Sequence, residues 1–458
     1  MSEIGYALFG AEPETTAFPS TTAEVQELVR ASDGKAIAPW GGGTRQHIGY
    51  APERYDLALS TSKLCHIVEY APGDMVVTAE AGVIVADLQR ALAEHGQFLP
   101  VDVAEPERQT VGGLVASRPD SLRRFAYGSV RDCLIGVKVV NAKAELITGG
   151  GKVVKNVSGY DLPKLYCGSY GTLGVIVEAS FKVSPLPELS STAMLALTAD
   201  HNSEDVLDLL LGSDLSPSFL YLLNPQAAQD LLGAPADQTD GPHPDPPLQG
   251  GSQVLIVGLD GSADAVDWQS KALTSLTGGG CVGETSSPPL TLSVNGEKKE
   301  DGQGRPSYDR RGRSVSENEQ SRQIRALLRD FPHRPASAAA SFHIMSSQIG
   351  AFSRMVEWTA RRAGFTASVV ADAAVGMMWA QFEPRGEMGN WSNFWKDLND
   401  KALRCGGSFI VERMPDEWRA ADVPVWSPIL PDFALMRRMK DTLDPGRMWN
   451  PGRFVGRI

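Results

Sequence analysis

The chain has 458 residues, of which 42% are hydrophobic, and its formal net charge is −12. This length and hydrophobic share allow a large buried core and predict two or three domains. The acidic balance, with both signs of charge mixed along the chain, argues against a nucleic-acid partner.

No apolar stretch of the sequence is long enough to span a bilayer, so we expect no direct membrane span. The first basic residue is Arg30, and the positively charged start of an export signal is therefore missing. We expect a cytoplasmic protein, or one that partner subunits hold at a membrane.

The five cysteines and seven histidines are scattered along the chain. No two cysteines form C-x-x-C, and the histidines lack the spacing of a helical metal site. The usual local iron–sulfur and zinc patterns are therefore excluded, and we predict no metal site. An odd, scattered set of cysteines fits a reducing compartment.

Residues 1–187 show a continuous pattern that predicts mixed strands and helices. Thr21 and Glu24 form a T-x-x-E capping box ahead of apolar residues at helical spacing, which predicts a helix start. Because the elements lack a regular βαβ rhythm, we favour an α+β fold over a doubly wound sheet. We expect strands at 36–38, 75–79, 134–140, 144–148 and 175–183, and a helix at 85–94 that ends before Gly96.

The pattern changes after Pro187, where short strand-like and helix-like runs alternate, for example at 253–258 and 263–276. Residues 234–252 and 286–320 are rich in small, polar and charged residues. Neither stretch can bury enough apolar area to offset its ordering entropy, so we predict flexible loops there.

Apolar residues at helical spacing return near the C-terminus, after Pro431. They are Phe433, Met436, Met439 and Leu443. The predicted organisation is a first domain, a second cap domain, and a C-terminal helix with a following segment. These parts cover residues 1–187, 188–430 and 431–458.

A glycine-rich turn, Gly41, Gly42, Gly43 and Thr44, follows the first of these predicted strands. Consecutive glycines let main-chain N–H groups converge on one anion, and such a nest suits a diphosphate. Taken alone, the segment also fits a tight turn. The sequence lacks a Walker loop and a G-x-G-x-x-G between a strand and a helix, which argues against kinase, NTPase and Rossmann sites.

Further glycine-bearing motifs follow in a fixed order, and together they resemble those of the vanillyl-alcohol-oxidase, or PCMH-type, FAD-binding family. The ordered motifs are G-G-G-T, T-x-G-G, Y-G-x-x-R-D, K-N-x-x-G-Y-D-L, G-S-x-G-T-L-G-V-I and a terminal N-P-G-R-F. The K-N-V-S-G-Y-D-L form at 155–162 is similar to FAD-binding subunits of glycolate oxidase, in particular the smaller GlcE type. The resemblance covers residues 17–187 and 440–454.

The resemblance implies a two-subdomain FAD-binding domain, a second α+β cap or substrate domain, and a C-terminal segment that returns to the flavin. It also implies the cofactor-binding residues, from the pyrophosphate to the ribityl or adenine side and the isoalloxazine. These are Gly41, Gly42, Gly43, Thr44, Thr110, Gly112, Gly113, Gly171, Gly174, Ile176 and Asn450. Relatives with a covalent flavin attach it through a histidine at the place of Thr44, so non-covalent FAD is expected.

By the same resemblance, the substrate is a small 2-hydroxy acid such as glycolate. Its oxidation needs a cation for the carboxylate and a base for the hydroxyl. The candidates in the second domain are His343 as base and Arg413 for the carboxylate. A packed core histidine and a salt-bridged strand arginine are the alternatives for these two positions.

The larger catalytic relatives carry an H-x-x-x-G-D-G-N metal motif, which this sequence lacks. The leading hypothesis is therefore a FAD-binding subunit of a glycolate oxidase or dehydrogenase complex, which accepts or relays electrons. Such complexes contain a second flavin subunit and an iron–sulfur subunit. The alternatives are a non-catalytic flavin-binding or assembly subunit, and a stand-alone FAD oxidoreductase acting on another alcohol, amine or sugar.

Overall fold

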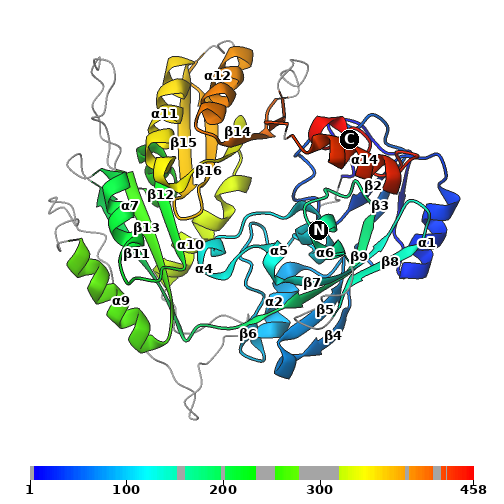
Figure 1. The fold of residues 1–458 in the computed structure, drawn as a ribbon, viewed down its shortest axis with the longest axis horizontal. Coiled ribbons are helices and arrows are strands. Elements are labelled where there is room, and N and C mark those ends of the chain that lie inside the picture. The colour runs from blue at the N-terminus through cyan, green and yellow to red at the C-terminus, as the bar shows by residue number, and fades with distance from the viewer. Residues whose placement is uncertain are drawn as a thin grey trace.

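The computed structural model describes residues 5–151, 160–197, 202–233, 253–277, 319–386, 391–415, 424–429 and 431–458. These residues form two halves that lie side by side (Figure 1). The glycine-loop half holds both chain ends and the elements up to β10, and the eight-stranded half holds the elements from β11 to β18.

The glycine-loop half contains a three-stranded parallel sheet and a five-stranded antiparallel sheet. The three-stranded sheet has the order β1 (Thr15–Ala17), β3 (Leu57–Ser60) and β2 (Ile37–Trp40). The five-stranded sheet has the order β4 (Ile67–Ala71), β5 (Val76–Glu80), β9 (Val175–Lys182), β7 (Leu134–Val140) and β8 (Leu146–Gly150). A separate two-stranded pair joins β10 (Ser184–Pro185) to β6 (Gln97–Phe98).

Short helices connect these strands. They are α1 (Thr22–Ala31), the 3₁₀ turn η1 (Pro72–Asp74), α2 (Val85–Ala93), α3 (Val111–Ser117), α4 (Arg124–Tyr127), α5 (Val130–Cys133) and α6 (Leu162–Tyr166). The predicted helix start at Thr21 is confirmed, because its Oγ1 accepts a hydrogen bond from the Glu24 amide at 3.1 Å. The Glu24 carboxylate accepts from the Ser20 amide instead of the Thr21 amide, so the box is displaced by one residue.

Most predicted elements of this half exist within a residue or two of their expected bounds. The prediction for β7 is confirmed residue for residue, while β8 begins two residues later than expected. The T-V-G-G segment differs in kind, because the structure makes it the first turn of α3 with Thr110 as its cap. A hydroxyl followed by a short apolar run predicts such a cap, but its two glycines made a loop the simpler interpretation.

The eight-stranded half is one antiparallel sheet in the order β11-β13-β12-β15-β16-β14-β17-β18. Its strands are β11 (Leu189–Leu197), β13 (Gln253–Gly261), β12 (Phe219–Leu223), β15 (Phe365–Asp372), β16 (Met377–Pro384), β14 (Ala338–His343), β17 (Ser408–Arg413) and β18 (Trp426–Ser427). Its helical segments are α7 (Ser203–Leu211), α8 (Pro225–Leu232), α9 (Ala263–Leu276), α10 (Glu319–Asp330), η2 (Phe331–His333), η3 (Ser346–Gln348), α11 (Ile349–Arg362) and α12 (Trp391–Arg404).

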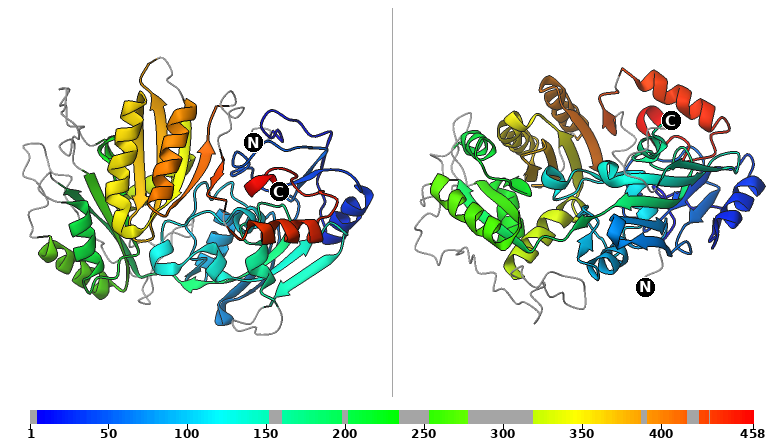
Figure 2. Two further views of the ribbon diagram at one scale, coloured as in Figure 1. Left: turned by 45° about the horizontal axis from the view of Figure 1, so that its top comes forward. Right: turned by 60° about the horizontal axis from the view of Figure 1, so that its bottom comes forward.

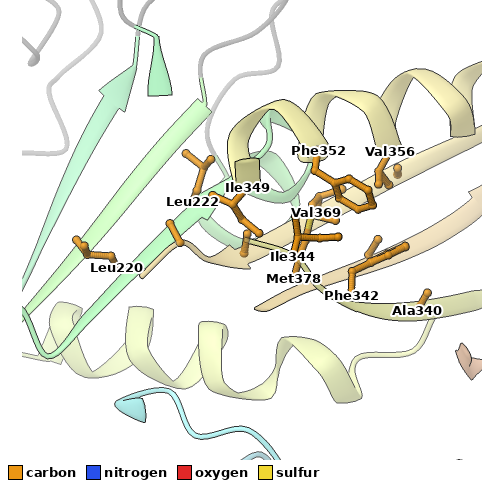
Figure 3. Packing of buried hydrophobic residues seen from close by; sticks show 14 of the residues in the cluster. Leu220, Leu222, Ala340, Phe342, Ile344, Ile349, Phe352, Val356, Val369 and Met378 are labelled. Atoms are coloured by element: carbon orange, nitrogen blue, oxygen red, sulfur yellow. The ribbon is translucent and has the colours of Figure 1, made fainter. Parts of the chain in front are cut away.

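Both faces of this sheet are buried, because helices cover each of them (Figure 2). Leu220 and Leu222 of β12 share the main core with Phe352 of α11, as Figure 3 shows. Phe219 and Tyr221 alternate with them along β12 and pack in the second cluster with α8 and α10. This two-residue alternation is the normal consequence of the strand pleat.

The predicted loop at 234–252 lies outside the described residues, and so do residues 286–318 of the second predicted loop. Glu319 and Gln320 begin helix α10, so the second predicted loop extends two residues too far. None of the helices in the described ranges has the length and apolar character needed to cross a membrane.

The C-terminal helix α14 (Phe433–Leu443) forms where the apolar spacing predicts it. Its one fully buried residue is Lys440, whose Nζ donates to Asp444 Oδ2 at 2.7 Å and to the carbonyls of Thr172 and Trp449. Beyond the helix, Trp449 forms a parallel bridge with Ile37 at the edge of β2, and the chain ends in the 3₁₀ turn η4 (Val455–Arg457). The terminal segment therefore returns to the glycine-loop half.

Candidate functional site

A pocket of about 770 Å³, including its part open to solvent, lies in the glycine-loop half where three separate segments meet. The lining residues are Pro39, Trp40, Gly41, Gly42, Gly43, Thr44, Arg45, Gln46, Ile48, Thr61, Gln109, Gly112, Gly113, Ala116, Ser117, Tyr170, Gly171, Gly174, Val175, Ile176 and Arg453.

The first wall is the turn after β2, which packs its backbone directly against residues 108–110. A Cβ atom added to Gly42 would overlap the carbonyl oxygen of Arg108, and one added to Gly41 would overlap Thr110 Oγ1. Because the Arg108 carbonyl belongs to the backbone, it cannot turn away as a flexible side chain would. These two glycines are therefore required by a close approach within the protein as well as by any ligand.

The second wall is the start of α3. Thr110 Oγ1 accepts from the Gly113 amide at 3.2 Å, and Gly112 lies so close to Ala81 that a Cβ would be 2.7 Å from the alanine Cβ. Thr44 joins this wall to the first, because its Oγ1 donates to Gln109 Oε1 at 2.5 Å.

The third wall is the turn between α6 and β9. Tyr170, Gly171 and Gly174 have positive φ angles of 52°, 67° and 149°. A tyrosine in the left-handed region is uncommon and needs support from its surroundings. Asn450 provides that support, because its Nδ2 donates to the Tyr170 carbonyl at 2.9 Å.

The structure thus brings nine of the eleven sequence-predicted cofactor residues into the lining of one pocket: Gly41, Gly42, Gly43, Thr44, Gly112, Gly113, Gly171, Gly174 and Ile176. Thr110 and Asn450 are 3% exposed and stand behind the walls, where they hold the turns in place. Asn450 belongs to the terminal segment on the β2 edge and not to the second half, because its main-chain N–H donates a hydrogen bond to the Ile37 carbonyl.

The charges around the pocket favour an anionic ligand. Arg45 and Arg453 are lining residues, and no described lining residue is a carboxylate. Arg453 Nη2 donates to the Gln46 carbonyl at 2.8 Å, which holds the segment after the glycine turn. Converging main-chain N–H groups suit a diphosphate, so the residues present fit the dinucleotide that the motifs predict. The arginines add positive charge for a further anionic group.

Sequence reasoning missed three of the polar groups at this site: Arg45, Tyr170 and Glu412. Arg45 Nη2 lies 3.7 Å from Oε2 of Glu412, which comes from β17 in the other half. Burial raises the pKa of the Tyr170 phenol, which therefore stays protonated at neutral pH. The sequence pointed only to Arg45, through its position directly after the glycine turn. Tyr170 and Glu412 come close to Arg45 only in the tertiary fold.

The two sequence candidates for catalysis lie away from the pocket lining. His343 ends β14 with an exposed side chain, so the alternative of a packed core histidine is wrong. An apolar run predicts burial, but His343 is the last residue of the strand, beyond its buried part. Arg413 ends β17, and its Nη1 donates to the Arg334 carbonyl at 2.8 Å. Neither residue lines the described pocket.

A second histidine, His333, lies nearer to this region. Its Nδ1 is 3.1 Å from Glu105 Oε2, and its ring stands edge-on to that of His47 at 5.9 Å. Burial and the nearby Arg45 cation lower the pKa of His333. Within the described ranges, no group of three or more His, Cys, Asp or Glu side chains is arranged to hold a metal ion.

Comparison with known proteins agrees with the geometry of the pocket. Residues 13–150 match the profile of the family described as FAD binding domain. Glycolate oxidase subunit GlcD of Bacillus subtilis (strain 168) is 34% identical over 217 residues, which are 46% of this chain and 46% of that protein. Glycolate oxidase subunit GlcE of Escherichia coli (strain K12) is 43% identical over 129 residues, which are 28% of this chain and 37% of that protein.

The matched region is thus less than half of either relative's own length. A solved structure of alkyldihydroxyacetonephosphate synthase superposes with a TM-score of 0.65 and 17% identity, covering 96% of this chain and 77% of that chain. At this identity the likeness concerns the fold, and it confirms the expected α+β architecture of an FAD-binding domain followed by a second domain. Residues 13–150 are thus similar to the FAD binding domain, as the ordered glycine motifs predict.

Proposed function

We propose that the chain holds FAD without a covalent bond in the glycine-lined pocket and uses it to accept or relay the electrons from a small 2-hydroxy acid. The observation that carries this proposal is the convergence of three distant glycine segments on one pocket with arginines and no described carboxylate in its lining. An extended dinucleotide needs several such close main-chain approaches.

In this proposal, Gly41–Thr44 and Gly112–Gly113 hold the pyrophosphate, and Gly171–Ile176 hold the ribityl or adenine side through main-chain contacts. Asn450 acts from behind the third wall by fixing the turn at Tyr170. Non-covalent binding is supported by Thr44, which stands where covalent relatives have a histidine, and by the lack of histidine among the described lining residues.

When bound, FAD supplies a two-electron acceptor for the C–H bond of the substrate. The chain itself supplies a protonated phenol at Tyr170 and a cation at Arg45 on the same pocket wall. The two polar groups that a hydroxy acid presents to a protein, a charged carboxylate and a neutral hydroxyl, both find donors there.

We further propose that the chain works as the FAD-binding subunit of a glycolate oxidase or dehydrogenase complex, with a second flavin subunit and an iron–sulfur subunit. The support is the likeness to proteins named as glycolate oxidase subunits. Scattered cysteines support a cytoplasmic setting, with any membrane association made by the partners.

We propose domain boundaries near residues 187 and 430. Leu189 begins β11 at one edge of the eight-stranded sheet, and Ser427 ends β18 at the other edge. The segments before and after this sheet contribute to the glycine-loop half.

The absorption spectrum of the purified chain, followed by acid release of the pigment, tests cofactor identity and covalency together. A flavin spectrum with pigment that acid releases is the expected result. A correctly folded but colourless chain that refuses added FAD contradicts the proposal.

Anaerobic addition of glycolate then separates the functional alternatives. Bleaching of the isolated chain indicates a chain that is catalytic alone, and bleaching only with partner chains indicates an electron-relaying subunit. Bleaching by other alcohols but not by glycolate indicates a stand-alone oxidoreductase with another substrate. A bound flavin that no donor reduces, with or without partners, favours a non-catalytic assembly subunit.

A further inference from the structure

The side chain of Arg45 lines the pocket at the seam between the two halves of the molecule. It follows the first glycine wall directly, and 15% of the side chain is exposed. Burial lowers the pKa of Arg45, but Glu412 and Tyr170 outweigh this effect and raise it overall, so the guanidinium is charged. A buried cation at the wall of a pocket is a strong point of attraction for an anion.

The hydrogen-bonding capacity of this guanidinium is only partly used. The distance of 3.7 Å between Arg45 Nη2 and Glu412 Oε2 gives charge attraction without a hydrogen bond. Arg45 Nε is buried and has no hydrogen-bond partner among the described residues. Because a guanidinium fork matches a carboxylate through two parallel N–H donors, the unused Nε is a position for such a ligand.

Glu412 itself is held from the other side. Its Oε1 accepts a hydrogen bond from Ser341 Oγ at 2.7 Å, between the neighbouring strands β14 and β17. Glu412 as a residue is only 6% exposed, so its carboxylate would be costly to leave without a counter-charge. Its contact with Arg45 supplies that counter-charge, and its bond from Ser341 remains if Arg45 turns to another anion. A ligand must therefore bind Arg45 strongly enough to exceed the cost of leaving Glu412 without its counter-charge.

Tyr170 stands next to this pair on the same pocket wall. Its phenol interacts with the Arg45 side chain, and the phenol is also close enough to Glu412 to be influenced by its charge. The positive φ of Tyr170 and the bond from Asn450 fix its backbone in an uncommon conformation. Such a locally strained residue is often found where a side chain must be aimed at a ligand.

The second lining arginine has a different role. Arg453 Nη1 donates to Gln46 Oε1 at 2.6 Å, and Nη2 donates to the carbonyls of Gln46 and Ile48. These bonds support the segment that follows the glycine turn. Arg45, in contrast, has a charge contact with Glu412 at 3.7 Å, and a ligand carboxylate can compete with Glu412 for its donors.

We propose that Arg45 and Tyr170 form a binding subsite for a small carboxylate with a neighbouring hydroxyl, and that Glu412 occupies the ligand's place on Arg45 when the subsite is empty. The ligand carboxylate takes the Arg45 fork, and its 2-hydroxyl contacts the Tyr170 phenol. This inference rests on the proposed function and gives that function's substrate class a specific position at the seam.

Direct binding of oxalate and acetate to the full FAD-loaded chain, and of glycolate to the same chain with its flavin reduced beforehand, tests the subsite without turnover. Isothermal titration calorimetry measures each affinity. Arg45→Gln is expected to weaken oxalate binding by about thirtyfold or more while FAD content stays unchanged. Arg404, an exposed arginine on α12, gives the matched control. Arg404→Gln is expected to leave both oxalate binding and FAD content unchanged. Arg45→Lys keeps the charge without the fork and is expected to fall between the parent and Arg45→Gln.

Two further variants test the partners of Arg45. Glu412→Gln still accepts from Ser341 but no longer competes for Arg45, so oxalate binding is expected to tighten by about three- to tenfold. Tyr170→Phe is expected to weaken glycolate binding by about tenfold. Binding of acetate, which lacks the hydroxyl, is expected to weaken by less than about twofold. Thermal melting of each variant confirms that it is folded.

Several outcomes overturn the inference. Unchanged oxalate binding in Arg45→Gln means that Arg45 is not a carboxylate site, and loss of FAD from this variant assigns Arg45 to the diphosphate. Unchanged or weaker oxalate binding in Glu412→Gln means that Glu412 supports Arg45 and does not compete with the ligand. If Tyr170→Phe weakens glycolate and acetate binding equally, the proposed contact between the 2-hydroxyl and the Tyr170 phenol is wrong.

The proposed function fails separately, when the parent chain refuses FAD. Oxalate binding can then be measured on the flavin-free chain, because the Arg45, Tyr170 and Glu412 contacts involve protein atoms only.

Discussion

The two halves of the molecule use opposite kinds of residue to reach their structures. The main core of the glycine-loop half is almost entirely aliphatic, with Tyr166 and Phe181 as its fully buried aromatic members. The main core of the eight-stranded half is rich in aromatic rings, and Phe365 and Trp391 have centroids only 3.9 Å apart. Figure 3 shows part of the main core of the eight-stranded half, where Phe342 of the sheet meets Phe352 of the helix α11.

The difference reflects what each half must position. Around the pocket, the backbone itself approaches a neighbouring backbone, as Gly42 does with Arg108, so the absence of a side chain is the structural requirement. In the eight-stranded sheet, side-chain volume fills the space between layers, and large rings supply it. The first half is therefore sensitive to added atoms, and the second to atoms or charges that its core cannot accommodate.

The most severe test of this contrast is a single methyl group at Gly42. Gly42→Ala is expected to displace the turn from the Arg108 carbonyl and to weaken FAD binding by more than about a hundredfold, while the eight-stranded half stays folded. Gly42→Val is expected to abolish FAD retention, because its larger side chain both overlaps the Arg108 carbonyl and occupies the ligand's space. Bound FAD per chain after gel filtration measures the effect.

Gly73→Ala is the matched control, because a Cβ at Gly73 would meet nothing within 4 Å. FAD content near one per chain in Gly42→Ala would show that the turn tolerates a side chain, and the contrast between the halves would lose its clearest case.

Lys440 is the next test, because the glycine-loop half depends on it as a buried cation. Lys440→Met leaves the Asp444 carboxylate buried without its partner and frees the Thr172 carbonyl on the third wall. We expect the free energy of unfolding to fall by about 3–5 kcal/mol in denaturant titrations. Arg438→Met, an exposed position on the same helix, is expected to change stability by less than about 0.5 kcal/mol.

The pair Lys440→Met with Asp444→Asn removes both charges together. It is expected to recover part of the loss, since no buried charge is then left without a partner. Equal stability of Lys440→Met and the parent protein would mean that the terminal segment is attached by its apolar contacts alone.

Local signals in the sequence were enough for most elements and for the glycine walls. The bounds of β7 and α9 match their predictions, because alternation and helical spacing act over a few residues. The order of the eight-stranded sheet was beyond reach, since β12 pairs with β15 across more than a hundred residues. Long-range pairing depends on which apolar faces meet, and many strands offer equivalent faces.

The same limit applied to the candidate site. The glycine segments are recognisable in the sequence because close backbone approaches and positive φ angles require glycine itself. Lys440 lies within an apolar helical pattern that gave no reason to bury a lysine, and its partners include a carbonyl from Thr172. Glu412 reaches Arg45 only through the packing of the two halves. Charge pairs of this kind have no local signature.

Asp372 tests the eight-stranded half, whose core holds a carboxyl group at the end of β15 that is 1% exposed. Burial raises the pKa of Asp372 to about 8, against the lowering effect of the Val375 and Ala374 amides. The folded protein keeps this proton to about pH 8, whereas the unfolded chain releases it near pH 4. The stabilisation is therefore full below about pH 4 and declines as pH rises to about 8, by at most about 1.4 kcal/mol per unit.

Asp372→Asn removes this titration, so we expect the melting temperature to fall less between pH 5 and pH 8 than in the parent protein. The advantage of the variant is expected to be largest at pH 8 and to shrink toward pH 5. Asp208→Asn, an exposed position on α7, is the control and should follow the parent curve. Parallel pH curves for Asp372→Asn and the parent would show that the carboxyl titrates normally.

The smallest expected effect concerns Thr21, which lies in the glycine-loop half but outside the pocket lining. Thr21→Ala removes the acceptor of the Glu24 amide and should cost about 1 kcal/mol of stability, measured by urea unfolding. FAD affinity is expected to stay unchanged, because Val25 and Val29 still anchor α1 from its buried face. Thr22→Ala, one residue inside the helix, is the control. If Thr21→Ala also loses FAD, FAD binding is sensitive to substitution throughout the glycine-loop half. If the variant keeps FAD, that sensitivity is confined to the pocket walls where backbone meets backbone.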